Sequence, residues 1–358
     1  MVGHRTLQNT TPIGRGRRLP LFFTALAALL GVHVISGGEN AAATEPQVVH
    51  VAVAARAISA LPLFVALDRG YFAGQGLDVK FDYFGAGPAA MASLVGGSSQ
   101  FLYGALEDGL KAVKRGLPIV VTMTGLARLT CGLVIRKDIA DKLGHKPTVA
   151  DLKGLRIGTL GRGGFTDLAT RYTLISAGIN PDKDATLIPI QGGDRQIAAG
   201  EAKAVDANML SDPFSVLAVE KLGTWSYIIN FTAGEGPEVF DDFGFSMVET
   251  SKSYLASNRQ TVEKMMHAIV RAQNYIADPT HLDNLLKIAL KEFPKNDPAV
   301  LRRVIKNAAP AWKPAVLSSM ITKNVKLLQT TGQIKGTPPA YNDIVETSLS
   351  SIWKEYSR

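Results

Sequence analysis

A glycine-rich segment at residues 161–167, Gly-Arg-Gly-Gly-Phe-Thr-Asp, carries the strongest chemical signal in the sequence. A strand-like run at 155–160 precedes it, and a helical pattern at 168–177 follows it. The first N–H groups of a helix have no partner and lie at the positive end of its dipole, so an anion fits at such a junction. The hydroxyl of Thr166 or the guanidinium of Arg162 can add a contact. The alternative is a plain tight turn whose glycines serve packing alone.

This segment does not match either of two familiar nucleotide-binding patterns. The Gly-Lys-Ser/Thr ending of a P-loop is missing. The spacing of the dinucleotide-binding pattern G-x-G-x-x-G and its later acidic residue are not matched either. The segment is therefore interpreted as an anion-binding loop outside both classes.

The elements that must position such a loop are visible in residues 48–104. Three strand-like runs, at 49–53, 77–84 and 100–103, are separated by helical patterns, and each leads into small residues. One of these loops, at 85–88, opens a helix with Pro88 near its first position. In an open α/β sheet such loops line a crevice at the carboxyl ends of the strands, where ligands bind.

Two polar residues mark a later crossing from strand to helix. Asn208 lies in the strand-like run 204–210, and Asp212 with Pro213 starts the next helix. Their position makes both of them candidates for ligand contact. The alternative for Asp212 is ordinary capping of that helix.

Residues that could carry out catalysis or hold a metal are scarce. The sequence has one cysteine, Cys131, and its histidines beyond the first forty residues are His50, His145, His267 and His281. None of the last three lies in an expected cleft loop, and no nucleophile–base pair or pair of carboxylates has convincing spacing. The sequence also lacks a metal-binding pattern of His, Cys and Asp. We therefore predict a protein that is not an enzyme and uses no cofactor and no metal.

The first 43 residues have the pattern of a cleaved secretory signal peptide. Three arginines within 15–18 precede an apolar run at 19–35, and three alanines at 41–43 give a cleavage pattern, with cleavage expected after Ala43. The alternative is an uncleaved membrane anchor, although the run is short for a span of about 20 apolar residues. The pair Arg17-Arg18 also leaves twin-arginine export open.

The charge balance does not indicate a protein that binds nucleic acid. The formal net charge is +8, and loss of the signal peptide, which holds four arginines and one glutamate, lowers it to +5. No block of Lys and Arg interleaved with aromatic residues appears. A single cysteine permits no intramolecular disulfide, so an exported chain must depend on its hydrophobic core.

The chain changes character after residue 251. Up to that point strand-like and helical patterns alternate, which is typical of an α/β fold. Beyond it the pattern is helical, with helices expected at 257–276, 281–292, 298–307, 314–330 and 341–353. This order predicts C-terminal helices packed around a first α/β lobe.

Three motifs near the start of the expected mature chain resemble the opening signature of one protein family. They are Leu-Pro-Leu-Phe-Val-Ala at 61–66, Gly-Tyr-Phe at 70–72 and Gly-Leu-Asp-Val at 76–79. The family is that of the periplasmic substrate-binding proteins of nitrate, sulfonate and taurine ABC importers, which are related to thiamine-precursor-binding proteins. Further matches follow in the family's order at 85–88, 94–101, 116–118, 134–137, 151–158, 178–179 and 198–207.

The resemblance covers nearly all of residues 47–275, and it implies a two-lobed α/β fold of the periplasmic-binding-protein type (type II) with two crossover strands. One departure is Ser98-Ser99-Gln100, where the family usually has an acid before the aromatic residue; that position is structural in the family. The crossings are expected near 126–127 and 243–244. Residues 44–126 and 244–358 would then form the first lobe, with the C-terminal helices packed on it, and residues 127–243 the second.

The resemblance also implies how such a protein works. A ligand would contact both lobes and shift an open–closed equilibrium by hinge closure. The closed form would dock on a membrane permease whose partner ATPase drives import. We therefore expect a periplasmic monomer that binds a small molecule and no nucleic acid.

In this fold the ligand is expected at loop positions where strands end, held mainly by backbone N–H groups. The candidate ligand-binding residues chosen on this ground are Ala57, Ile58, Ser59, Gly87, Gly104, Ala105, Arg128, Thr130, Gly163, Gly164, Phe165, Thr166, Asn208 and Asp212.

The sequence leaves several ligands, and two other classes of protein, as alternatives. A sulfonate, taurine or similar small organic anion fits the glycine loop and Arg128. An aromatic carboxylate or a thiamine-precursor pyrimidine fits about as well, because of Phe165 and the lack of a second firmly placed arginine; nitrate and bicarbonate binders are related. The same fold hosts enzymes, among them a pyrimidine-forming synthase with a cysteine-rich motif and a site histidine that this chain lacks. A sensor would present its ligand to a receptor instead of a permease.

Overall fold

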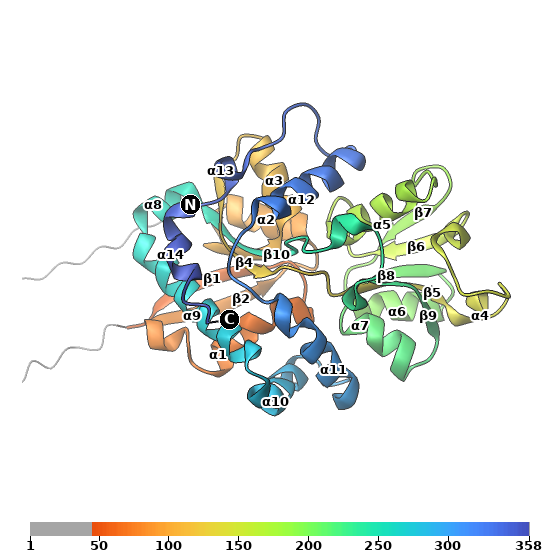
Figure 1. Ribbon diagram of the computed structural model, residues 1–358, viewed down its shortest axis with the longest axis horizontal. Helices are drawn as coiled ribbons and strands as arrows, with labels where there is room; N and C mark the ends of the chain where they lie inside the picture. The colour runs from red at the N-terminus through yellow and green to blue at the C-terminus, as the bar shows by residue number, and fades with distance from the viewer. Residues whose placement is uncertain (1–44, 358) are drawn as a thin grey trace, which may run out of the picture. The chain divides into compact units, whose positions relative to one another are not determined.

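The computed structural model describes residues 45–357, so the expected signal peptide at 1–43 lies outside the described residues. Within them the chain forms two five-stranded sheets flanked by helices (Figure 1). The bodies built on these two sheets are called the first and the second lobe below. None of the helices in this range combines the length and the apolar character that a membrane span requires.

The sheet of the first lobe has strands β1 (Gln47–Val53), β2 (Leu77–Tyr83), β3 (Phe101–Ala105), β4 (Ile119–Leu126) and β10 (Ser246–Ser251). Its order is β2-β1-β3-β10-β4, with β1 parallel to β2 and β3 and β10 antiparallel to β3 and β4. The three parallel strands lead into helices α1 (Leu61–Asp68), α2 (Gly87–Val95) and α3 (Leu106–Lys114). Because parallel strands end at the same edge, the loops that open these helices gather there.

The second lobe repeats this arrangement with strands β5 (Cys131–Arg136), β6 (Arg156–Thr159), β7 (Thr186–Pro189), β8 (Ala207–Ser211) and β9 (Trp225–Asn230). Its order is β7-β6-β8-β5-β9, with β6 parallel to β7 and β8 and β5 antiparallel to β8 and β9. Its helices are α4 (Lys137–Ala140), α5 (Phe165–Ser176), α6 (Gly193–Glu201) and α7 (Phe214–Val216). α5, α6 and α7 follow β6, β7 and β8, so their first turns also lie at one edge.

Two segments connect the lobes, as the predicted pair of crossover strands requires. Residues 127–130 run from β4 to β5, and residues 231–245 return from β9 to β10. The two segments are hydrogen-bonded to each other, because Gly244 N donates to Ala127 O and Phe245 N donates to Leu126 O, both at 2.8 Å. Paired extended backbone at this point gives a narrow connection that can bend.

The C-terminal helices pack on the first lobe, as predicted. α9 (Arg259–Ala277) and α10 (Leu282–Glu292) lie against α1, and α9 buries Met265 and Met266 completely. α12 has a wider role, since it packs against α3 of the first lobe and α5 of the second (Figure 1). The helices of this region are α8 (Lys252–Ser257), α9 (Arg259–Ala277), α10 (Leu282–Glu292), α11 (Pro298–Ala308), α12 (Ser318–Thr330), α13 (Tyr341–Ile344) and α14 (Ser350–Trp353).

Two of the expected C-terminal helices were predicted too long, and both errors have one cause. β4 is an edge strand, so its outer N–H and C=O groups need partners from elsewhere. Thr124 N donates to Pro314 O at 2.8 Å, which keeps residues 314–317 outside α12. Glu346 N donates to Val121 O at 2.9 Å, and Val345 forms a parallel bridge with Val121, which interrupts the helix expected at 341–353.

Candidate functional site

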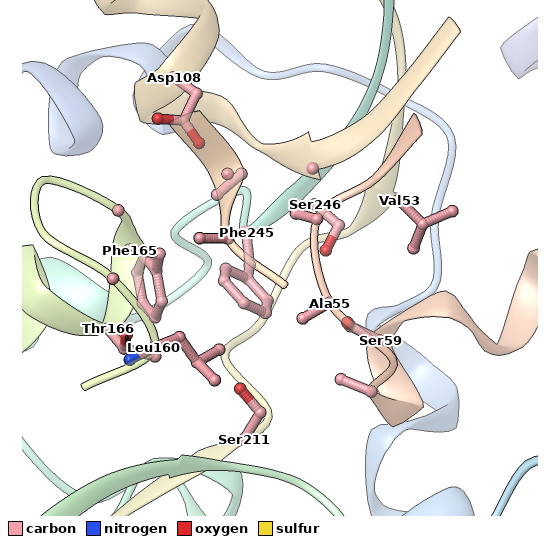
Figure 2. A pocket seen from close by; sticks show the side chains of 18 of the residues that line it. Val53, Ala55, Ser59, Asp108, Leu160, Phe165, Thr166, Ser211, Phe245 and Ser246 are labelled. Atoms are coloured by element: carbon pink, nitrogen blue, oxygen red, sulfur yellow. Dashed lines mark hydrogen bonds between the residues drawn. The ribbon is translucent and has the colours of Figure 1, made fainter. Parts of the chain in front are cut away.

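A pocket lies between the lobes, where the loop edges of the two sheets meet (Figure 2). It encloses about 580 Å³ when the solvent at its mouth is included. Its walls come from the ends of β1, β3, β6 and β8, from the starts of α2, α3 and α5, and from the second crossover segment with the first residue of β10. The part of this space that a water-sized sphere can occupy is about 60 Å³, so the enclosed pocket admits a small chemical group.

Three helices begin at this pocket, and none of them has a side-chain cap. Their N-cap residues are Ala86 for α2, Ala105 for α3 and Gly164 for α5, and all three line the pocket. A helix start without a cap leaves N–H groups free for a ligand and carries the positive end of the helix dipole. In α3 the first N–H, that of Leu106, already donates to Phe245 O at 3.3 Å, so the starts of α2 and α5, one from each lobe, remain to attract an anion without a basic side chain.

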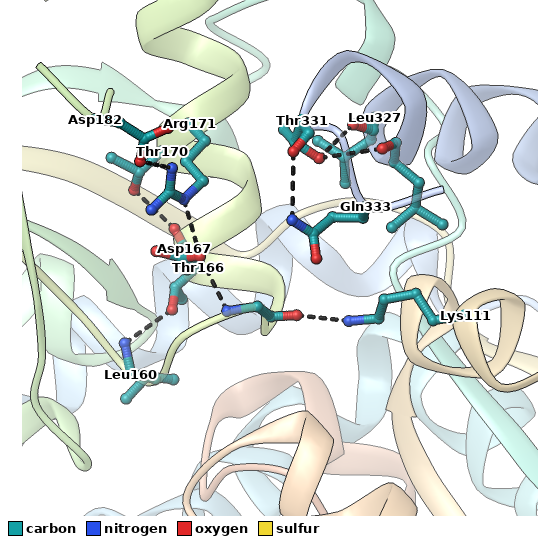
Figure 3. Close-up of polar contacts among 12 residues, drawn as sticks. Lys111, Leu160, Thr166, Asp167, Thr170, Arg171, Asp182, Leu327, Thr331 and Gln333 are labelled. Carbon is teal, nitrogen blue, oxygen red and sulfur yellow. Dashed lines mark hydrogen bonds and ion pairs between the residues drawn. The ribbon is translucent and has the colours of Figure 1, made fainter. Parts of the chain in front are cut away.

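The glycine-rich loop before α5 is held in shape from within. Leu160 N donates to Thr166 Oγ1 and Gly163 N donates to Asp167 Oδ2, both at 2.9 Å (Figure 3). Arg171 in turn contacts Asp167 at 3.2 Å and Asp182 at 2.6 Å. Since Thr166 accepts through its oxygen, its hydroxyl proton stays available to donate to a ligand.

Two glycines of this loop are needed because the first lobe comes very close. A Cβ atom on Gly161 would lie 3.0 Å from Ala86 Cβ, and one on Gly164 would lie 3.3 Å from Pro88 Cδ. Both distances are shorter than ordinary van der Waals contact. The glycine loop therefore lets the main chains of the two lobes approach each other at the pocket.

Aromatic rings form the apolar part of the wall. The ring centroids of Phe165 and Phe245 are 4.5 Å apart, and the two rings lie side by side in Figure 2. Tyr103 also lines the pocket, and its hydroxyl donates to Ser59 O at 2.8 Å. Burial raises the pKa of Tyr103, so this phenol stays neutral.

Asp108 is the one carboxyl group that lines the pocket, and no arginine, lysine or histidine of the described chain does so. Asp108 is buried, with Oδ1 at 2.7 Å from Lys111 Nζ and Oδ2 without a partner. Lys111 Nζ also donates to Gly163 O in the opposite lobe at 2.5 Å (Figure 3). The charge next to the pocket is thus a carboxyl–ammonium pair with one free carboxyl oxygen.

Two further buried acids lie behind this pair. Glu107 and Glu249 are fully buried, and their carboxyl oxygens have no hydrogen-bond partner in residues 45–357. Burial and the neighbouring Asp108 raise the pKa of Glu107 to about 8. Burial, Asp108 and Glu107 hold the pKa of Glu249 well above its usual range. Burial also raises the pKa of Asp108, although Lys111 opposes the shift. Three buried carboxyls that share one lysine therefore bind protons more readily than exposed carboxyls do.

More than half of the candidate residues from the sequence meet at this pocket. They come from loops of both lobes and from the end of β3, which runs two residues further than expected. The predicted residues that line the pocket are Ala57, Ser59, Gly87, Gly104, Ala105, Gly164, Phe165 and Thr166.

Four of the other candidates lie outside the wall of the pocket. Ile58 N donates across the lobes to Asp212 O at 2.9 Å. The Gly163 carbonyl accepts from Lys111, as described above. Arg128 is half-buried in the first crossover segment, and Thr130 is buried at its end.

Asn208 and Asp212 are buried beneath the loops of the second lobe. Asn208 Nδ2 donates to Gln196 O at 3.0 Å. The Asp212 carboxylate accepts from the hydroxyls of Ser215 and Thr232, the latter at 2.6 Å. Asn208 thus connects β8 to α6. Asp212, which follows β8, connects it to α7 and to the start of the second crossover segment.

Several pocket residues were not among the candidates. Most are small or apolar, and Phe245, at the end of the returning crossover, and Ser246, the first residue of β10, come from far along the chain. The residues missed are Val53, Ala54, Ala55, Ala86, Tyr103, Asp108, Leu160, Gly161, Ser211, Phe245 and Ser246. Candidates were chosen at loop positions where strands end. Choosing one or two more residues at each strand end would have included 53–55 and 160–161. Asp108 gave no such signal.

Two solved structures of binding proteins share this architecture. The alkanesulfonate-binding protein SsuA from Xanthomonas axonopodis, bound to MOPS, matches with a TM-score of 0.68 and 19% identity over 84% of this chain and 99% of that one. The periplasmic nitrate-binding protein NrtA from Synechocystis matches with a TM-score of 0.69 and 14% identity over 88% and 90%. At such identities the likeness concerns the fold, and it confirms the predicted periplasmic-binding-protein fold of type II.

Relatives by sequence are binding proteins as well. YtlA of Bacillus subtilis, named only as a binding protein, is 27% identical over 84% of this chain and 88% of its own length. The nitrate/nitrite-binding protein NrtA of Nostoc is 26% identical over 76% and 69%. The riboflavin-binding protein RibY of Chloroflexus aurantiacus is 25% identical over 76% and 73%. These relatives confirm the prediction of a binding protein over an enzyme.

The fold and the interlobe pocket together define a solute-binding protein of the two-lobed periplasmic class. The model of the NMT1-like family matches residues 42–290, which is most of the chain. The protein therefore belongs to the NMT1-like family.

Proposed function

We propose that the protein is the exported solute-binding component of an ABC importer and captures a small organic anion, such as a sulfonate, between its lobes. The observation that carries this proposal is the convergence of the uncapped starts of α2 and α5, one from each lobe, on one pocket. Nitrate and sulfonate binding by relatives and structural neighbours supports the anion class. In the periplasm the closed form would deliver the ligand to a membrane permease and its ATPase.

The proposed contacts follow from the pocket. The anionic group would accept from the first N–H groups of α2 and α5 and from the Thr166 hydroxyl. The apolar body of the ligand would lie against Phe165 and Phe245. The lobes would be residues 44–126 with 244–358 and residues 127–243, and they would close as rigid bodies about the paired crossover segments.

A second candidate is a neutral or weakly charged flat ring, such as a pyrimidine, or an aromatic carboxylate. The free oxygen of Asp108 can accept from an amino group, and the aromatic wall can pack against a ring. RibY, named for binding riboflavin, supports a ring of this kind.

A thermal-shift screen of residues 44–358 tests the proposal. The panel would contain alkane- and arenesulfonates, small carboxylates and substituted pyrimidines at equal concentrations. A ligand that binds only the folded protein raises the melting temperature by linkage. We expect sulfonates to raise it. A shift with pyrimidines and none with sulfonates would replace the anion proposal with the second candidate.

A further inference from the structure

A second groove adjoins the pocket and shares three of its lining residues. Ala55, Leu160 and Ser211 line both cavities, and all three are labelled in Figure 2. The outer groove encloses about 850 Å³ with the solvent at its mouth, more than the 580 Å³ of the pocket. A molecule longer than the pocket would therefore extend into this groove.

The outer groove differs from the pocket because basic side chains line it. Arg56 comes from the first lobe and Arg195 from the second. The Arg56 guanidinium lies 4.4 Å from the centre of the Tyr83 ring and contacts Glu292 at 3.0 Å, so its charge is partly matched. Arg195 is exposed and has no hydrogen-bond or ion-pair partner among residues 45–357. An unmatched guanidinium at this position attracts an anion.

The start of α6 adds to this attraction. Gly192 is the N-cap, no side chain caps the helix, and Gly192 and Gly193 both line the groove. Their main chain is also close-packed, since a Cβ on Gly193 would lie 2.3 Å from the Phe214 ring. Gly192 and Gly193 add no side chain of their own to this first turn, while Asp194, the next residue, places Oδ1 3.0 Å from the position of a Cβ on Gly192.

A buried side chain with an open hydrogen-bonding position completes the groove. Gln196 is fully buried, lines the groove and donates from Nε2 to Met209 O at 3.4 Å. Its Oε1 has no partner among the described residues. A buried amide oxygen without a partner is costly, so an O–H or N–H donor on the part of the ligand that links its two anionic groups would be stabilised here.

We propose that the groove is an outer subsite that binds a second anionic group on the same ligand. The ligand is then an elongated organic dianion: its first anionic group lies at the helix starts in the pocket, and a terminal carboxylate or sulfonate lies between Arg56 and Arg195. Because these arginines belong to opposite lobes, the second group also favours closure. This inference rests on the proposed function.

Isothermal titration with two matched probes tests the outer subsite. One probe is 4-propylbenzenesulfonate, and the other is 3-(4-sulfophenyl)propanoate, which replaces the terminal methyl by a carboxylate. In the unaltered protein we expect the dianion to bind about ten-fold more tightly, as one added charged contact would give. In Arg195→Ala we expect this advantage to disappear while 4-propylbenzenesulfonate binds unchanged.

Lys183→Ala is the matched control, since it removes one exposed positive charge from the same lobe outside the groove. It should keep the advantage of the dianion. Equal affinities of the two probes in the unaltered protein would overturn the outer subsite and leave the proposed function standing. An advantage that survives in an Arg56→Ala, Arg195→Ala double variant would overturn it too. If neither probe binds, the anion proposal for the pocket fails, and the outer subsite falls with it.

Discussion

Lys111 on α3 of the first lobe donates a hydrogen bond of 2.5 Å to the main-chain carbonyl of Gly163 in the second lobe (Figure 3). The same ammonium group lies 2.7 Å from Asp108, which lines the pocket. One buried side chain thus joins the ligand site, the glycine loop and the contact between the lobes. Lys111 therefore links the carboxyl group in the pocket wall to the contact between the two lobes.

Lys111→Met should weaken both the fold and ligand binding. The substitution keeps the apolar stem but leaves three buried carboxyls without a cation, which we expect to lower the free energy of unfolding by about 3 kcal/mol. It also removes the bond to Gly163, so the closed form loses a contact. Urea unfolding and titration with the sulfonate found in the screen measure the two effects. Lys114→Met, at an exposed position on the same helix, is the control, and an equal loss there would refute the role of Lys111.

The buried acids should make stability depend on pH between about 4.5 and about 8. Burial raises the pKa of Glu107 from 4.5 to about 8, so the folded chain binds more protons than the unfolded chain between these values. The free energy of unfolding then falls as pH rises, by up to about 1.4 kcal/mol per pH unit for each extra proton. Urea unfolding at pH 6, 7 and 8 should show this fall. Glu107→Gln should reduce the slope, and a stability that rises from pH 6 to 8 would contradict the prediction.

The fold could be predicted from the sequence because its signals are local and repeated. Strand-like runs that end in small residues, such as 49–53 before Ala57 and 155–160 before Gly164, identify the loop edge of each sheet. The lengths of the last helices could not be predicted, because the backbone of Val345 and Pro314 pairs with the edge strand β4. Backbone pairing between segments far apart in the chain cannot be read from the local pattern of apolar and polar residues.

The site was only partly predictable for a related reason. Strand-end residues show which loops can meet a ligand, and eight of them do line the pocket. Asp108 and Lys111 have the i, i+3 spacing of an ordinary solvent-exposed ion pair. They are buried because α3 is covered by α12, which arrives more than two hundred residues later. Arg128 had a suitable charge and position in the chain, but tertiary packing placed it in the crossover segment outside the pocket wall.

Gly161→Val should impair closure without unfolding the lobes. A side chain at this position would meet Ala86 of the first lobe, where an added Cβ already lies at 3.0 Å. We expect the affinity for the screened ligand to fall about ten-fold, roughly 1.4 kcal/mol, while the melting temperature without ligand stays the same. Gly74→Val is the control, because a Cβ there has no neighbour within 4 Å. An unchanged affinity in Gly161→Val would show that the lobes need not approach at this point.

Asp212→Ala should act on stability and leave binding nearly unchanged. The substitution leaves the hydroxyls of Ser215 and Thr232 without their acceptor in a buried position, which costs about 1–3 kcal/mol. The Asp212 side chain does not line the pocket, so the dissociation constant of the ligand should stay within two-fold or so. Unfolding by urea and calorimetric titration measure the two quantities. A large loss of affinity at unchanged stability would return Asp212 to the ligand site.

Phe245→Leu should distinguish aromatic from aliphatic ligands. Phe245 lies in the crossover segment with its ring 4.5 Å from that of Phe165, so an aromatic ligand can pack against both. Leucine keeps the apolar character but loses the ring contact, which is worth about 0.5–1.5 kcal/mol. We expect the affinity for benzenesulfonate to fall three- to ten-fold or so, while that for butanesulfonate changes little. Calorimetric titration of both sulfonates measures this difference, and equal losses for the two would mean that Phe245 only shapes the cleft.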